Sequence, residues 1–179
     1  MANEFGLNGA PASAAREPFC GVFDIRIAAD GTWHYRGSPI GRKELVKLFA
    51  SVLRRDAAGD YWLVTPVERG RIRVDDAPFT AVELTADGEG SAQRLTFRTN
   101  LDEMVVAGKD HPLRVSHDPG TGAPRPYILV RPGLEALVLR PVFYQLVELG
   151  VTLPRAGEEN FGVWSAGQFF PLGKLEEEA

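Results

Sequence analysis

Residues 33–49 read WHYRGSPIGRKELVKLF, a short aromatic run followed by a turn and then by a helical pattern. Apolar residues then recur at the spacing of one face of an α-helix, at Leu45, Leu48, Phe49, Val52 and Leu53. Ser38 and Pro39 stand where an N-cap and a proline at the first helical position would fall. The segment therefore predicts a strand, a capped turn and an amphipathic helix.

The glycines of this turn raise the question of a phosphate site. A Walker loop needs a longer spacing between its glycines, followed by Lys-Ser or Lys-Thr, and Gly37 and Gly41 do not meet that pattern. Arg42 and Lys43 would still add positive charge to a helix N-terminus, which attracts anions by itself. Plain capping explains the same residues without a ligand, so it is the favoured interpretation.

On both sides of this segment, alternating apolar and polar residues predict strands. Asp30-Gly31 supplies the positive φ for a hairpin turn between strands at residues 23–27 and 32–36. Further strands are predicted at residues 60–65, 71–76, 79–86, 94–99, 104–107, 113–116, 127–131 and 134–140, with a last strand or extended segment at 160–173. Pro141 fits the first position of a second short helix, residues 142–149, which Gly150 would stop.

The two predicted helices have similar surroundings. A strand, an arginine, a proline, the helix, a polar loop and an aromatic strand follow one another in both places. This order predicts an α+β fold of two packed halves that share a strand-helix-strand motif, although that order is also common without duplication. We expect a flexible N-terminal arm (1–18), an N-terminal α+β half (19–76), a C-terminal half (77–173) and an acidic tail (174–179). The seam between the halves is then the natural place for a ligand.

Composition narrows the class of protein. The chain has 179 residues, a net charge of −4 and a single cysteine, Cys20. We expect neither a nucleic-acid partner nor an internal disulfide, and we expect Cys20 to be a small buried side chain. No stretch has the length and apolar character of a signal peptide or a membrane span, which predicts a soluble, cytoplasmic protein.

Few residues suggest catalysis or metal binding. His34, His111 and His117 lack the spacing of a metal site, so we expect no metal and no cofactor. Adjacent acids such as Asp75 and Asp76 point apart on extended backbone, and no motif of a nucleophile or dinucleotide site occurs. The sequence therefore leaves enzymatic activity uncertain and favours its absence. Arginines at strand ends or turns suit anionic ligands and structural ion pairs equally well, namely Arg36, Arg98, Arg131 and Arg140.

Several motifs in order resemble a bacterial family of uncharacterised proteins, domain of unknown function 1285. They are WHYRGSPIGR, LVKLF, DYWLVTPVE, VDDAPF, PYILVR and GVWSAGQFFPLG, and the similarity spans residues 19–173. The resemblance implies a two-part α+β protein with a duplicated core motif. It also implies a C-terminal part that is superficially similar to a pleckstrin-homology-like fold, a bent antiparallel sheet closed by a helix. For activity it implies a binding site at the interface of the two parts and a role in signalling.

The main hypothesis is a non-enzymatic protein of bacterial signalling or regulation that binds a small molecule or a protein partner in the seam. Its candidate ligand-binding residues are polar or turn residues that a core does not require: Arg36, Ser38, Pro39, Arg42, Thr65, Pro66, Glu68, Asp75, Asp76, Phe79, Arg98 and Asn100. The alternative is a small enzyme whose site in the same interface has no local motif and combines His34, Asp75 and Tyr61. A homo-oligomeric scaffold is a third hypothesis.

Overall fold

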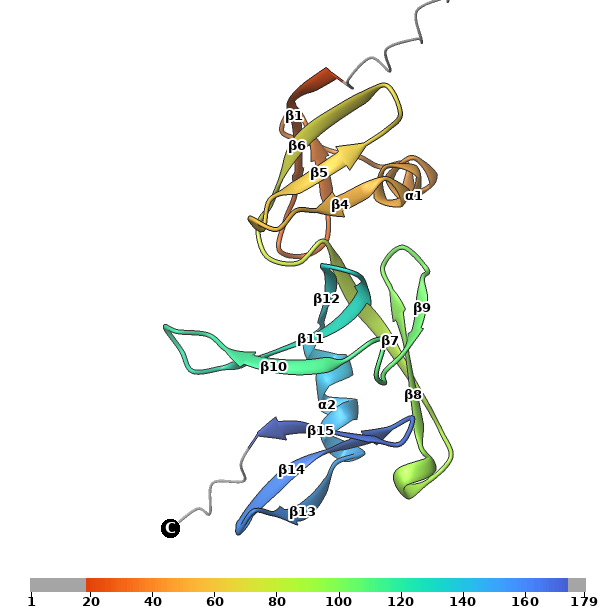
Figure 1. The fold of residues 1–179 in the computed structure, drawn as a ribbon, viewed down its shortest axis with the longest axis vertical. Helices are drawn as coiled ribbons and strands as arrows, with labels where there is room; N and C mark the ends of the chain where they lie inside the picture. Colours follow the sequence, from red (N-terminus) through yellow and green to blue (C-terminus); the bar gives the residue numbers. More distant parts are fainter. Residues whose placement is uncertain (1–18, 174–179) are drawn as a thin grey trace, which may run out of the picture.

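The computed structural model describes residues 19–173, and over this range the chain is mostly β-structure with two short helices (Figure 1). The strands form two six-stranded sheets and one three-stranded sheet, which lie one after another along the long axis of the molecule. The arrangement is α+β-like, as expected, but with far more strand than helix. The predicted arm (1–18) and acidic tail (174–179) lie outside the described residues.

The first six strands form the N-terminal sheet, in the order β3-β2-β1-β6-β5-β4. Its central strands β1 and β6 are parallel, and its other neighbours are antiparallel. Gly31, with φ 87°, closes the predicted β1–β2 hairpin. In chain order the elements of this half are β1 (Phe19–Ile27), β2 (Trp33–Tyr35), β3 (Ser38–Pro39), α1 (Lys43–Ser51), β4 (Leu53–Arg55), β5 (Tyr61–Val64) and β6 (Glu68–Val74).

The next six strands form the central sheet, in the order β10-β11-β12-β7-β8-β9, again with one parallel pair, β7 and β12, at its middle. A three-stranded antiparallel C-terminal sheet follows helix α2, and α2 lies against β7 and β14. The elements are β7 (Phe79–Asp87), a short 3₁₀ helix η1 (Gly90–Ala92), β8 (Arg94–Thr99), β9 (Met104–Val106), β10 (Leu113–His117), β11 (Pro124–Arg131), β12 (Leu134–Val138), α2 (Arg140–Glu148), β13 (Val151–Arg155), β14 (Glu158–Ser165) and β15 (Gln168–Gly173).

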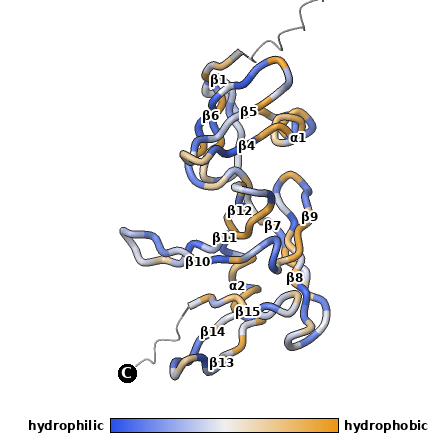
Figure 2. The backbone as a smooth tube through the Cα atoms, viewed as in Figure 1, coloured by the Kyte–Doolittle hydropathy of each residue, from blue (hydrophilic) through white to orange (hydrophobic). Residues whose placement is uncertain are grey.

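One hydrophobic core joins these layers. Ile27, Trp33 and Leu53 are fully or almost fully buried in the N-terminal half, and Phe97 and Ile128 are buried in the C-terminal half. Burial of each such side chain stabilises the fold by about 1.5–3 kcal/mol. Figure 2 shows the contrast between apolar β9 and the largely hydrophilic β6, whose alternate residues leave the core.

The start of α1 corrects the predicted cap. Ser38 and Pro39 form strand β3, which pairs with β2 after a two-residue turn at Arg36 and Gly37. Both turn residues have positive φ, 50° and 80°, which is the geometry of a tight hairpin. The helix begins only at Lys43, and its N-cap residue makes no side-chain cap hydrogen bond. Hairpin pairing thus takes the residues that the sequence assigned to helix capping.

The end of α1 corrects the predicted apolar face. The helix ends at Ser51, and Leu53 belongs to β4, where it pairs with Leu63 of β5. The buried helical residues are Val46 and Ala50, whereas Leu48 is 63% exposed. Because Leu53 pairs in the sheet, the helix is shorter than predicted. Its core-facing side carries Val46 and Ala50 instead of Leu48.

The second helix agrees better with the prediction, because Pro141 lies in its first turn and the helix ends before Gly150. The predicted polar loop after it contains strand β13. Each helix is therefore followed by antiparallel strands rather than by a loop and one strand, and the strand-helix-strand repeat is not confirmed in its predicted form. The predicted burial of Cys20 is wrong, because this cysteine lies exposed on β1.

Candidate functional site

A bulge in β1 borders two hollows of the N-terminal sheet. In the parallel ladder, the step from Val22 to Arg26 on β1 lies opposite the shorter step from Arg71 to Arg73 on β6. Extra residues in one strand bend it and re-aim its side chains. Phe23 turns against the backbone of β6, where a methyl group at Gly70 would lie 2.2 Å from its ring. The bulge borders a hollow on each side of the sheet, since residues 22–25 line both.

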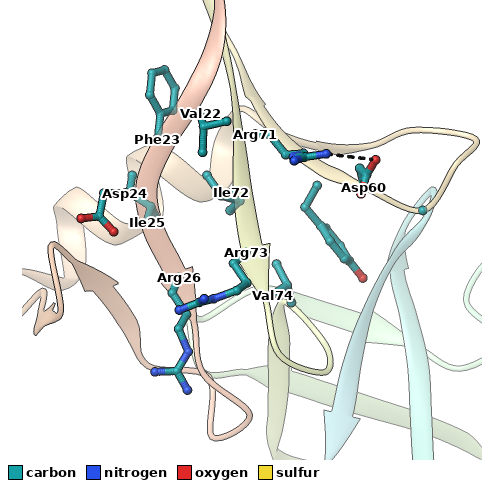
Figure 3. A pocket seen from close by; sticks show the side chains of 12 residues that line it. Val22, Phe23, Asp24, Ile25, Arg26, Asp60, Arg71, Ile72, Arg73 and Val74 are labelled. Carbon is teal, nitrogen blue, oxygen red and sulfur yellow. Dashed lines mark ion pairs between the residues drawn. The ribbon is translucent and has the colours of Figure 1, made fainter.

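The larger hollow, named here the arginine hollow, has a volume of about 710 Å³. Figure 3 shows arginine side chains from β1 and β6 around it, with Asp60 and Val22 on its rim. Ile72 of β6 is buried in the same core as α1, so its neighbours Arg71 and Arg73 leave the sheet on the face away from that helix. Its lining includes Val22, Arg26, Asp60, Tyr61, Arg71 and Arg73.

The three arginines of this hollow have different partners. The Nε of Arg26 donates to both carboxylate oxygens of Asp75 at 3.0 Å, and this contact lowers the pKa of Asp75 and raises that of Arg26. Arg71 lies 3.8 Å from a carboxylate oxygen of Asp60, which is too long for a hydrogen bond. The Arg73 guanidinium makes no hydrogen bond or ion pair with any residue of the described range, although its charge also lowers the pKa of Asp75. The hollow therefore contains guanidinium groups that can still accept a partner.

A fourth arginine continues the row along β6. Arg69 shares the face of Arg71 and Arg73 because alternate residues of a strand point the same way. Its guanidinium lies 4.0 Å from the centre of the Trp62 ring, and its Nε is buried without a hydrogen-bond partner. The Trp62 Nε1 donates to Asp56 at 2.8 Å and so fixes that ring. This face of the sheet is basic over the length of β6.

The smaller hollow, named here the α1 groove, has a volume of about 470 Å³ and lies between β1, β2, β5 and the end of α1. Its lining is largely apolar: Val22, Phe23, Ile25, Tyr35, Phe49, Val52 and Leu63. Asp24, Arg36, Thr65 and Glu68 complete it. The Arg36 guanidinium lies 5.1 Å from the centre of the Tyr35 ring. The groove thus combines an apolar interior with a few charged groups, the usual composition of ligand sites.

The seam between the two halves is held by charge. Asp102 lies 3.0 Å from Lys43 and 2.9 Å from Lys47, both on α1, and 3.2 Å from Arg98 on β8. Hydrogen bonds from the two lysines are the main reason that the pKa of Asp102 falls to about 2. A φ of 66° places Asp102 in the left-handed region. This aspartate therefore links α1 to the turn between β8 and β9.

Two further contacts close the seam. The Nη2 of Arg131 donates to the Ala50 carbonyl oxygen at 3.0 Å, at the end of α1. The side chain of Asn100 accepts from the backbone N–H of Thr80 at 3.1 Å and donates to the Gly31 carbonyl oxygen at 3.3 Å. The cavity left between Ala50 and Arg131 is about 270 Å³, which is small for a ligand site.

The twelve sequence-predicted site residues do not gather at the seam. Arg36, Thr65 and Glu68 come together in the α1 groove. Thr65 is engaged with its own turn, since its hydroxyl accepts from the Glu68 N–H at 3.1 Å. The remaining surface residues of the group are exposed at separate turns or strands, namely Ser38, Pro39, Arg42 and Pro66.

The other five predicted residues make contacts within the protein. Asp75 binds Arg26, and Asp76 accepts hydrogen bonds of 2.7 Å from Arg125 and Tyr127. Three lie at or near the seam: Phe79, only 1% exposed; Arg98, paired with Glu83 and Asp102; and Asn100, which bridges the halves. These three residues were predicted to lie at an interface and do lie there. Their side chains are buried or bonded within the protein, so they are not free to bind a ligand.

Sequence reasoning missed the arginines of the hollow. Arg71 and Arg73 were visible as the polar residues of an alternating strand, but Arg26 comes from a strand more than forty positions earlier in the chain. Only the parallel pairing of β1 with β6 brings them together. Alternation of arginine with apolar residues in RIRV was the one available signal, and it does not reveal the partner strand.

The proposed catalytic trio does not form a hydrogen-bonded set, although His34 lies near enough to Asp75 for its charge to help lower the pKa of that carboxyl. No hydrogen bond joins His34, Asp75 and Tyr61 within residues 19–173. Burial raises the pKa of Tyr61, which lines the arginine hollow. The Nδ1 of His111 lies 2.8 Å from the Leu129 carbonyl oxygen. In the described part of the chain, no three His, Cys, Asp or Glu side chains gather as a metal site would require.

Both halves of the molecule match models of one family. Residues 10–77 match the N-terminal domain of a domain of unknown function, DUF1285, and residues 78–172 match the C-terminal domain of the same family. The chain belongs to the DUF1285 family. The boundary between the two family models falls just before β7, where the chain leaves the N-terminal sheet. No curated protein matches the chain.

Two solved DUF1285 structures resemble this chain. A protein from Silicibacter pomeroyi DSS-3 is 49% identical, with 89% of this chain and 85% of that chain covered and a TM-score of 0.82. A protein from Shewanella baltica OS155 is 27% identical, with 71% and 92% covered and a TM-score of 0.55. The arrangement of the elements is thus shared within the family, most closely with the first of these two. Neither helix of residues 19–173 has the length and apolar character needed to cross a bilayer.

Proposed function

We propose that this DUF1285 protein is a non-enzymatic binding protein that holds a phosphate-bearing small molecule in the arginine hollow. The observation that carries the proposal is the Arg73 guanidinium, which lines a hollow of about 710 Å³ without a hydrogen-bonding or ion-pairing partner in the described residues. Arginine forks match the oxygens of phosphate groups, and the volume is that of ordinary ligand sites.

The charges around the hollow favour an anion modestly. Three arginines line it together with two aspartates, Asp24 and Asp60. Arg26 is occupied by Asp75, which lies outside the lining, while the contact of Arg71 with Asp60 is loose at 3.8 Å. A phosphate group would thus find its strongest partners in Arg71 and Arg73, and Arg26 would be a fixed charge beside them.

The hollow also relates to the interface expected from the sequence. Its member Tyr61 lies close enough to the C-terminal half for the charge of Glu135 on β12 to raise its pKa, after the larger effect of burial. A ligand there would contact the N-terminal sheet and lie beside the seam. The proposal has three further parts. They are a role in bacterial signalling, a pleckstrin-homology-like C-terminal half and a structural repeat. The antiparallel strands packed against α2 and the shared strand order of the two six-stranded sheets support its structural part.

The test is calorimetric titration of the full chain with inorganic pyrophosphate at low salt. We expect binding that Arg73→Ala and Arg71→Ala each weaken by about tenfold, because each removes one charge-assisted contact. The matched control is Arg94→Ala, an exposed arginine of β8, which should bind as the parent does. Equal affinity of the parent and Arg73→Ala, or no binding by the parent, would overturn the proposal. Size-exclusion chromatography with light scattering tests the separate hypothesis of a homo-oligomer.

A further inference from the structure

One edge of β1 is open beside the α1 groove. On one side, β1 pairs with β6 from Phe19 onward. On the other side, β2 pairs only with residues 25–27, and a single further hydrogen bond joins the Arg36 N–H to the Asp24 carbonyl oxygen at 3.0 Å. No described residue pairs with residues 20–23 along this edge. The strand therefore presents unpaired backbone groups just past the β2–β3 turn.

Apolar side chains surround this open edge. Val22 is 75% exposed and Tyr35 is 47% exposed, although both side chains are large and apolar. Both line the α1 groove, in which Phe49 and Leu63 form the deeper surface. A strand added to β1 in line with β2 would place every second side chain over this groove. The open backbone and the apolar hollow thus belong to one surface.

We propose that this surface binds an extended peptide segment of a partner protein by strand addition to β1. In this mode, main-chain hydrogen bonds supply much of the affinity, and a pocket for alternate side chains supplies specificity. The α1 groove receives one apolar side chain of the peptide. An extended peptide can pair with the row of unpaired backbone donors and acceptors on β1. A small apolar molecule cannot, so a peptide is the expected occupant.

Charge defines the chemistry of the partner. Asp24 and Glu68 line the groove, and the one cation there, Arg36, lies against the Tyr35 ring. The groove lining is therefore net acidic, in contrast to the arginine hollow on the opposite face of the same sheet. We expect the bound segment to alternate apolar residues with lysine or arginine. The two hollows share residues 22–25 of β1, but Arg71 and Arg73, on which the phosphate proposal depends, line only the arginine hollow, so the two proposals can fail separately.

The experiment selects peptides from a random display library against the full-length protein. We expect enrichment of segments that alternate apolar and basic residues, and synthetic copies should bind in fluorescence titrations. N-methylation of alternate peptide bonds should weaken binding by about fivefold or more, because it removes backbone donors that strand addition requires. The single thiol, Cys20, lies on the open part of β1 and should react more slowly with iodoacetamide when the peptide is bound.

Charge reversal supplies the second measurement. Asp24→Lys should weaken binding of the basic peptides by about tenfold, because attraction at the exposed rim becomes repulsion. The control, Asp87→Lys, reverses an exposed charge at the end of β7 and should change nothing, as should Arg73→Ala. Several results would overturn the proposal: no enrichment, enriched peptides insensitive to both N-methylation and Asp24→Lys, or enrichment only of sequences matching residues 1–18 of this chain. Competition by a second copy of the chain would likewise reassign the edge to self-association.

Discussion

The two six-stranded sheets have the same strand order but different middles. Each is built from two three-stranded antiparallel units, and in each the first strand lies parallel to the last. In the N-terminal sheet this central ladder is bulged between Val22 and Arg26. In the central sheet the corresponding ladder of β7 and β12 runs in regular register from Phe79 to Ala81.

The difference separates a hollowed surface from a packed core. At their regular ladder, β7 and β12 bury Phe79, Ala81, Ala136 and Val138, and α2 lies against β7. The bulged strand β1 leaves Val22 exposed and borders two hollows. Irregular pairing costs ladder hydrogen bonds but opens space for a ligand, whereas regular pairing allows close packing. One strand order therefore gives either a hollowed or a closely packed centre, depending on the register of its central pair.

The largest expected effect tests the core side of this comparison. Phe97→Ala should reduce the free energy of unfolding by about 3–5 kcal/mol, because Phe97 is fully buried in the central sheet and its loss leaves a cavity. Val22→Ala in the bulge should change it by less than about 0.5 kcal/mol. Urea unfolding followed by circular dichroism measures both. If the two substitutions cost the same, the assignment of β1 to binding and β8 to packing is wrong.

A smaller effect tests how the two halves are joined. Asn100→Ala should destabilise the protein by about 1–3 kcal/mol, because the N–H of the buried Thr80 loses its acceptor. Asn160→Ala is the matched control, since Asn160 makes one long hydrogen bond of 3.4 Å, to the Glu158 carbonyl oxygen two residues away in β14. Thermal denaturation of both variants provides the comparison. Equal melting temperatures would mean that Asn100 is dispensable at the seam.

The sequence could predict the features that neighbouring residues determine, but not those that depend on distant partners. Most strands, the Gly31 turn and the Pro141 helix start were predictable because neighbouring residues determine them. Leu48 was assigned to the core by its spacing, but it is 63% exposed because the pairing of Leu53 with Leu63 decides where the helix ends. Sequence spacing does not contain that pairing.

The candidate site follows the same rule. Arg36, Thr65 and Glu68 were chosen as turn residues, and the fold does bring them into one groove. The arginine hollow depends on the ladder between β1 and β6 and on its bulge, which no local pattern encodes. Arg98 and Asn100 were chosen for the same polar character, yet Arg98 pairs with Glu83 and Asp102 in its own half and Asn100 donates across the seam to Gly31, so both are structural. Polar residues at turns thus indicate a site or an interface without distinguishing the two.

The smallest expected effect concerns pH and the seam. The folded pKa of Asp102 is about 2, below its ordinary value of 3.8, because Lys47 and Lys43 bind its carboxylate. Stability from this group is fully present above the unfolded pKa and is lost as pH falls from about 4 toward 2. Asp102→Asn should therefore flatten the fall of unfolding free energy over that range, while asparagine still tolerates the left-handed backbone. Asp87→Asn, at an exposed strand end, is the control. Chemical denaturation at a series of pH values measures the slopes, and parallel curves for parent and Asp102→Asn would show that the lysines do not hold this carboxylate in solution.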